Sequence, residues 1–168
     1  MTLHIPKVKR RIIADGTTYE VACAVCADGT TSPVAKFLDE LKAKRWTSQL
    51  SSDEQVSAYA WILAAIEWFA DSGEFPHLGD RNQLMNGIWE IKHWNLRISF
   101  YDTDGLGNFN PKITERIYVA GGGYCPLPEF DEYIRLGTVF EKTTTKTSAA
   151  ELALAAQIRD EDLSHDKA

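Results

Sequence analysis

Two adjacent side chains that can transfer protons, Lys92 and His93, lie near the end of a predicted β-strand, residues 87–94. Consecutive side chains of a strand point to opposite faces, so at most one of the two can face a given site. Lys92 shares no face with Trp89 and Ile91, which indicates that it faces solvent. The sequence leaves open whether His93 belongs to the site, to the core or to the following turn.

Two arginines on later predicted strands could bind phosphate. Arg97 begins the outward-facing set of the strand over 96–102, and its guanidinium can grip a phosphate through two parallel hydrogen bonds. An exposed sheet arginine that pairs with a carboxylate is an equally good interpretation. Arg135 alternates with apolar neighbours in the strand over 132–140, so we expect it to face the same surface as Arg97.

A third group of cations lies in the loop "FEKTTTKTS" that joins this last strand to a helix. Lys142 and Lys146 stand among threonine hydroxyls, close to the amides that begin the helix, and both features favour a bound phosphate. Ser148 and Glu151 have capping-box spacing and predict the helix start. The alternative is that Thr147 or Ser148 only caps the helix and that both lysines are solvated.

Several elements must position these groups. The sequence predicts a strand over 17–25, a helix that begins at Ser32-Pro33, and a longer helix over 51–73. The predicted buried stripe of the longer helix consists of Val56, Tyr59, Ala60, Leu63 and Ala64. Its flank with Trp61, Ala65 and Trp68 is also apolar, so this helix is either deeply buried or meets a partner.

The predicted fold class is α+β: an antiparallel sheet with two N-terminal helices on one face and a short C-terminal helix. We expect one domain over residues 1–160. Segment 103–131 is expected to be an insertion with one additional strand near 113–121, in which "AGGGYCP" forms a turn, and residues 161–168 a frayed acidic tail.

The stretch "GIWEIKHWNLRISFYD", followed by an apolar strand and "FEKTTTKTSAAELALA", resembles the RelE/ParE superfamily of bacterial toxins, and within it the HigB-like, phage-derived host-inhibition branch. The resemblance spans roughly residues 34–160 in element order, and the motifs agree over 87–102 and 138–155. The chain departs from that pattern at the 103–131 insertion, at Glu141, where a basic residue is common, and in its acidic charge.

The resemblance implies a RelE-like fold and the toxin of a type II toxin-antitoxin module, a ribosome-dependent messenger RNA endonuclease (mRNA interferase) that blocks translation. Lys92, His93 and Arg97 would be catalytic, and Arg135, Lys142 and Lys146 would bind RNA phosphates. No metal or other cofactor is expected, and the expected partners are an antitoxin of helix-turn-helix type, the ribosome and mRNA. The alternative is a non-catalytic toxin-fold protein that inhibits a host protein, as a ParE-like protein acts on gyrase.

Composition restricts these functions further. Lys and Arg number 18 against 24 Asp and Glu, so the net charge is −6 and only a local basic patch could bind nucleic acid. The sequence contains no apolar run long enough for a membrane span, and three cysteines do not form a disulfide framework, so a cytoplasmic protein is expected. Cys23 and Cys26 have CxxC spacing, but a strand would point them to opposite faces, which argues against zinc.

Overall fold

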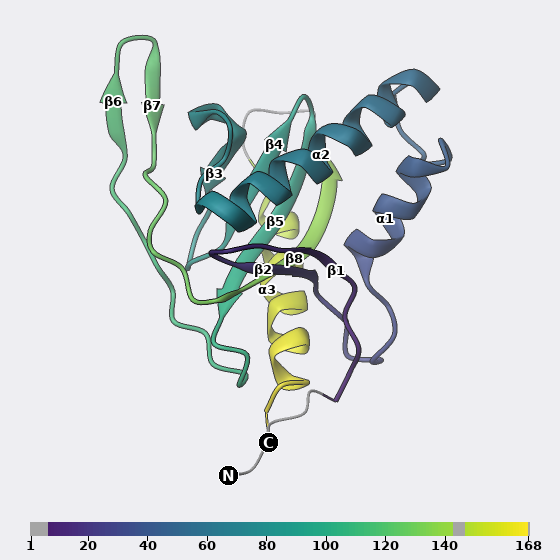
Figure 1. The fold of residues 1–168 in the computed structure, drawn as a ribbon, viewed down its shortest axis with the longest axis vertical. Helices are drawn as coiled ribbons and strands as arrows, with labels where there is room; N and C mark the ends of the chain where they lie inside the picture. The colour runs from purple at the N-terminus through teal and green to yellow at the C-terminus, as the bar shows by residue number, and fades with distance from the viewer. Residues whose placement is uncertain (1–6, 143–146, 168) are drawn as a thin grey trace.

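The computed structural model describes residues 7–142 and 147–167, and these form an α+β fold (Figure 1). Six strands form one sheet in the order β1-β2-β8-β5-β4-β3, in which all neighbours are antiparallel except β2 and β8. The elements in chain order are β1 (Ile12–Asp15), β2 (Glu20–Cys23), α1 (Pro33–Lys42), α2 (Ser52–Ser72), the 3-10 turn η1 (Leu78–Asp80), β3 (Arg81–Gln83), β4 (Trp89–His93), β5 (Leu96–Thr103), β6 (Ile117–Val119), β7 (Gly122–Tyr124), β8 (Tyr133–Glu141) and α3 (Ala149–Ser164).

Local signals fix the ends of the helices. The Ser51 hydroxyl accepts a hydrogen bond from the Glu54 amide, and the Glu54 side chain accepts one from the Ser51 amide, which forms the predicted capping box of α2. Gly73 ends this helix in the left-handed conformation, with φ of 77°. Ser148 and Glu151 form the same reciprocal cap at the start of α3.

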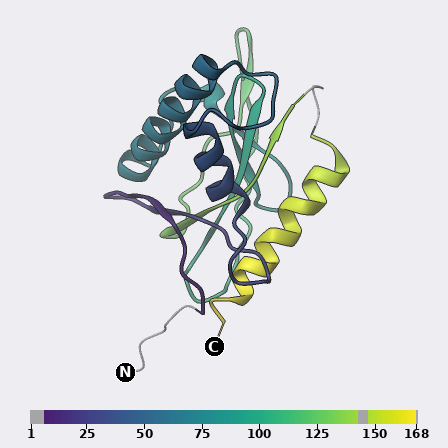
Figure 2. The same cartoon turned by 90° about the vertical axis from the view of Figure 1, so that its right-hand side faces the viewer.

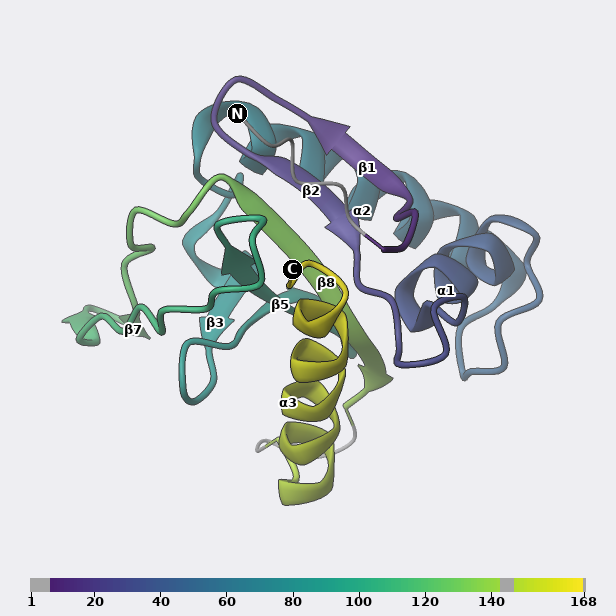
Figure 3. The same cartoon turned by 90° about the horizontal axis from the view of Figure 1, so that it is seen from below.

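Helices α1 and α2 cover one face of the sheet, and α3 covers the other (Figures 2 and 3). The main core lies between the sheet and the first two helices, where Phe37, Leu41, Ile66, Phe69 and Trp89 are buried. Within the described residues, none of the three helices combines the length and apolar character needed to cross a membrane.

The buried face of α2 differs from the predicted one. Val56 is 44% exposed, and Ala60 and Ala64 are also exposed. The face against the sheet instead consists of Gln55, Ala58, Ile62, Ala65, Ile66, Phe69 and Ala70. The prediction was wrong because this helix is apolar nearly all round, so periodicity alone does not select the core side.

The C-terminal segment is not frayed, which corrects the prediction for residues 161–168 as far as Lys167. Helix α3 extends to Ser164, and both Asp162 and Asp166 are fully buried. They face Arg10 from the start of the chain, a partner more than 150 positions away that local sequence does not reveal.

The segment over 103–131 contains two short strands where one was expected. β6 and β7 pair with each other in a separate ribbon that projects from the molecule (Figure 1). Gly121 and Gly122 have φ of 88° and 145°, values that glycine adopts without strain, so the glycines predicted as a turn also begin β7. The apolar side chains of Tyr118 and Val119 remain exposed on this ribbon.

Candidate functional site

Three of the predicted site residues meet on the α3 side of the sheet. The β4–β5 hairpin pairs Lys92 directly with Arg97, and both alternate with residues of the main core. Lys142 follows β8, and its backbone amide donates to the carbonyl of Asn95 at 2.6 Å, which holds it beside the hairpin turn. We call Glu90, Lys92, Arg97 and Lys142 the cationic cluster, because one carboxyl group lies among three basic side chains.

Glu90 lies at the centre of the cationic cluster and is fully buried. Its Oε1 accepts a hydrogen bond from the Asn82 amide at 3.4 Å and lies 3.7 Å from Nε of Arg97. Burial raises the pKa of the Glu90 carboxyl, and the Asn82 hydrogen bond and the charges of Lys142, Arg97 and Lys92 counteract that rise only in part. Glu90 is therefore a structural carboxyl group, and it holds the neighbouring cations close to one another.

Lys92 has the chemistry of a candidate base. Burial lowers the pKa of its amine, and repulsion from Arg97, Lys142 and Arg116 lowers it further, while Glu90 opposes the change. A lower pKa increases the fraction of neutral amine near pH 7, and only the neutral form can accept a proton. Among the predicted residues, Lys92 thus combines partial exposure with a shift in the direction that general base catalysis requires.

Arg97 is held by the turn next to it. Its Nη1 donates to the carbonyl oxygens of Trp94 at 2.7 Å and of Leu96 at 2.9 Å. Trp94 has φ of 53°, which is unusual for a bulky residue, so the turn that positions Arg97 is strained. The sequence left open whether Arg97 binds phosphate or pairs with a carboxylate. Both interpretations have support, because Arg97 approaches Glu90 and also belongs to a group of cations.

His93 lies on the opposite face of the sheet, as strand alternation predicted. Its ring stacks between Trp61 at 4.1 Å and Trp94 at 4.4 Å, measured between ring centroids. Burial lowers the pKa of this imidazole, with Asp80 opposing the change, and its buried Nε2 has no hydrogen-bond partner among the described residues. The stacking makes His93 part of the contact between α2 and the hairpin.

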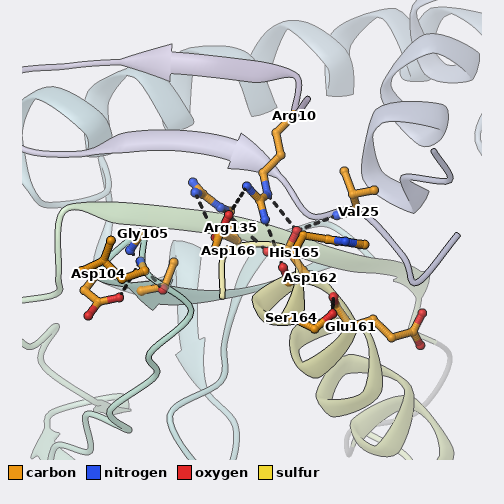
Figure 4. Close-up of polar contacts among 12 residues, drawn as sticks. Arg10, Val25, Asp104, Gly105, Arg135, Glu161, Asp162, Ser164, His165 and Asp166 are labelled. Atoms are coloured by element: carbon orange, nitrogen blue, oxygen red, sulfur yellow. Dashed lines mark hydrogen bonds and ion pairs between the residues drawn. The ribbon is translucent and has the colours of Figure 1, made fainter. Parts of the chain in front are cut away.

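Arg135 faces the same side of the sheet as Arg97, as predicted from the alternation of its strand. It does not belong to the cationic cluster, however, but to a second set of charged residues (Figure 4). Its guanidinium lies 3.8 Å from Asp162 and 3.9 Å from Asp166, with its side chain 6% exposed. Arg10 donates to both aspartates at 2.9 and 2.8 Å, and the Tyr101 hydroxyl donates to Asp162 at 2.5 Å. We call these five residues the buried network.

The buried network connects distant parts of the chain. Asp162 also accepts a hydrogen bond from the backbone amide of Val25 at 2.8 Å, and its other partners come from the N-terminal segment and β5. Burial and the nearby Asp162 carboxylate raise the pKa of Tyr101 well above its usual range, so its hydroxyl stays protonated and donates. The network therefore anchors α3 to the sheet.

The other residues singled out in the sequence are two lysines of the β8–α3 loop and two cysteines. Lys146 lies outside the described residues, and Lys142 is half-buried in the cationic cluster. Cys23 is buried in the core, and Cys26 lies beyond the end of β2. In the part of the chain that the structure describes, no three His, Cys, Asp or Glu residues could together hold a metal ion.

Sequence reasoning missed several residues of the cationic cluster and of the buried network. Glu90 carried a usable signal, because it alternates with Lys92 on the same strand. Asn82 and Arg116 carried none, since β3 and the segment before β6 approach the hairpin only in the folded chain. Arg10 and Asp162 lie in segments that appear solvent-exposed and polar when each is considered alone.

Comparison with models of known protein families, with curated proteins and with solved structures finds no match to this chain.

Proposed function

We propose that this chain is a ribosome-dependent endoribonuclease that cuts messenger RNA without a metal cofactor, acting as the toxin of a two-component module. The observation that carries the proposal is the cationic cluster, in which Lys92, Arg97 and Lys142 gather around one buried carboxyl group. The element order also supports it: two helices on one face, then a hairpin, a long strand and a helix on the opposite face.

The reaction proposed is attack of a ribose 2′-oxygen on the adjacent phosphate, which forms a 2′,3′-cyclic phosphate and breaks the bond to the 5′-oxygen of the next nucleotide. That oxygen leaves as a hydroxyl after it takes a proton from water. Lys92 would accept the proton of the 2′-hydroxyl, since its lowered pKa increases the neutral amine fraction. Arg97 and Lys142 would stabilise the negative charge that develops on the phosphate oxygens. His93 would position the hairpin through its stacking with Trp61 and Trp94.

The test is induced expression in a bacterial host, with growth and the 5′ ends of cellular mRNA measured together. The wild type is expected to arrest growth and to produce new cuts that disappear when translation is blocked. Lys92→Met should lower the cleavage rate about 100-fold or more, the range typical of a lost general base. Lys36→Met removes the same charge from the exposed surface of α1 and should change nothing.

Purified variants decide whether a loss of cleavage reflects chemistry or folding. Lys92→Met should keep the wild-type urea midpoint, because its side chain is only half-buried and lies outside the main core. Arg97→Met should lower the midpoint, because it removes two hydrogen bonds to the hairpin turn and the cation beside buried Glu90, so its cleavage rate is compared under conditions in which it is folded. Full cleavage by both variants would refute the assignment of the cationic cluster. An antitoxin of helix-turn-helix type, the partner expected under this proposal, should suppress the arrest when it is expressed together with the chain.

A second candidate function is non-catalytic inhibition of a host protein, and one exposed aromatic residue favours it. Trp68 on α2 is 58% exposed on the helix surface away from the sheet, in a chain with a net charge of −6. Large aromatic residues are enriched where protein surfaces bind each other. Under this alternative, growth arrest would occur with intact RNA, and Trp68→Ala would relieve it whereas Lys92→Met would not.

A further inference from the structure

A buried arginine with unused hydrogen-bond donors identifies a second site, separate from the cationic cluster. Arg135 donates no hydrogen bond to any described residue, and its buried Nε and Nη1 atoms have no acceptor. The two nearest carboxylate oxygens, at 3.8 and 3.9 Å, are beyond hydrogen-bond distance. Arg10 already donates to one oxygen of each carboxylate and to the Asp162 backbone carbonyl, while Oδ2 of Asp166 has no hydrogen-bond partner among the described residues (Figure 4).

Arg135 lines a pocket with a volume of about 390 Å³, within the range of small-molecule sites. Arg10 is a second cation in its wall, apolar surface comes from Val8, Ile12 and Leu106, and an aromatic ring comes from Tyr133. The guanidinium carbon of Arg135 lies 5.3 Å from the centre of that ring, which keeps the cation at this end of the pocket.

Two carboxylates line the same pocket and restrict the ligand. Glu20 and Asp104 both contribute to its walls, yet Arg135 forms ion pairs with neither within the described residues. Backbone and side-chain hydrogen bonds from Leu106 and Asn108 lower the pKa of Asp104 against the opposing effect of burial, so its carboxylate stays charged. Because two arginines and two carboxylates line the pocket, a phosphate dianion would match only the arginines, whereas a ligand with one negative and one positive end would match both kinds of charge.

The strand register places the backbones of Glu20 and Arg135 near each other. Glu20 pairs with Tyr133 across the parallel β2–β8 ladder, and Arg135 pairs with Ala22, two residues further along. The backbone positions of Glu20 and Arg135 are therefore roughly 8 Å apart, since the residue rise is about 3.3 Å and adjacent strands lie about 4.8 Å apart. The two residues are therefore close enough for their side chains to line one small pocket.

We propose that this pocket binds a small zwitterion of the amino-acid class. Arg135 and Arg10 attract the ligand carboxylate, and Glu20 with Asp104 attracts the ammonium group. The apolar residues and the Tyr133 ring contact the carbon chain between the two charges. The site is independent of the proposed ribonuclease activity, because Lys92 and Arg97 do not line this pocket.

The test is calorimetric titration of the purified full chain with γ-aminobutyrate and δ-aminovalerate, compared with butyrate, butylamine and inorganic phosphate. We expect saturable binding of at least one zwitterion, on the order of tenfold tighter than either singly charged analogue. Phosphate binding as strong as that of the zwitterions, or no saturable binding of either zwitterion at millimolar concentrations, would overturn the proposal.

Variants assign any binding to the pocket. Glu20→Gln should weaken zwitterion binding on the order of tenfold and leave butyrate binding unchanged, since it removes one charge-assisted contact. Leu106→Trp should abolish binding by filling the pocket, and the 54% exposure of Leu106 allows the larger side chain. Glu132→Gln removes the same charge from the exposed residue next to Tyr133 and is the matched control. Equal zwitterion affinity in the wild type, Glu20→Gln and Leu106→Trp would refute the site.

Discussion

Tyr101→Phe tests whether the buried network holds α3 on the sheet. The substitution removes one hydroxyl and preserves the ring, so it deletes the 2.5 Å hydrogen bond to Asp162 without a change in packing volume. Tyr101 is 1% exposed and Asp162 is fully buried, so water cannot replace the lost donor. A hydrogen bond to a charged group contributes about 1.5–3 kcal/mol.

We expect a loss of about 2 kcal/mol in the free energy of unfolding, in the lower part of that range. Arg135 lies 3.8 Å from the same carboxylate oxygen, and a small movement would allow it to donate in place of the hydroxyl. For a chain of this size, such a loss lowers the melting temperature by about 4–8 °C. Urea unfolding followed by tryptophan fluorescence measures the change directly, provided that the slope of free energy against urea stays constant.

The control is Tyr118→Phe, which removes a hydroxyl from a side chain that is 81% exposed. Its free energy of unfolding should match that of the wild type within about 0.5 kcal/mol. If Tyr101→Phe is equally neutral, the buried network does not anchor the helix and the reasoning fails.

Three further predictions concern the core and the cationic cluster. Burial raises the Glu90 pKa above its ordinary value of 4.5, so folded Glu90 binds its proton more tightly than Glu90 of the unfolded chain, and wild-type stability falls as pH rises from 4.5 through the folded pKa. Urea titrations should therefore show the stability of Glu90→Gln relative to the wild type increasing over that pH window, and a constant difference would contradict the raised pKa. Burial raises the pKa of the Cys23 thiol to about 12, so Ellman's reagent at pH 8 should modify Cys23 only after unfolding, and rapid modification of the native chain would contradict its burial. An added Cβ at Gly16 would lie 2.4 Å from the backbone of Ala70, so Gly16→Ala should cost about 1–3 kcal/mol in urea unfolding, whereas Gly79→Ala, with open space around it, should be neutral.

The parts of the fold that were predicted correctly depend on short-range interactions. Both capping boxes join residues three positions apart, and the strands on either side of Trp94 and Asn95 pair as a tight hairpin. That hairpin also fixes the pairing of Lys92 with Arg97, so this half of the cationic cluster could be predicted from the sequence. The general α+β architecture follows from the same local signals and from the alternation of the strands.

The parts that sequence reasoning missed depend on long-range contacts. β1 was not predicted because its residues follow a basic segment, and its place in the sheet depends on pairing with β2. Asp162 and Asp166 belong to an acidic segment that is typical of a solvated tail, and their burial is possible because Arg10 and Arg135 face them. Arg135 was assigned correctly to a sheet face, but its partners come from α3, which no local pattern indicates.

The two groups of charges on the α3 side of the sheet explain how an acidic chain could still bind a polyanion. In the buried network, two arginines face two aspartates, so the charges balance and little field extends into solvent. In the cationic cluster, three basic side chains face one carboxyl group, so positive charge remains in excess even when that carboxyl is ionised. The net charge of −6 is an average over the whole chain, whereas a phosphate group responds mainly to charges within about 8 Å at physiological salt. If RNA binds, its affinity should therefore fall when Lys92 or Arg97 is neutralised and should not change when Arg135 is replaced by Met in a variant that remains folded.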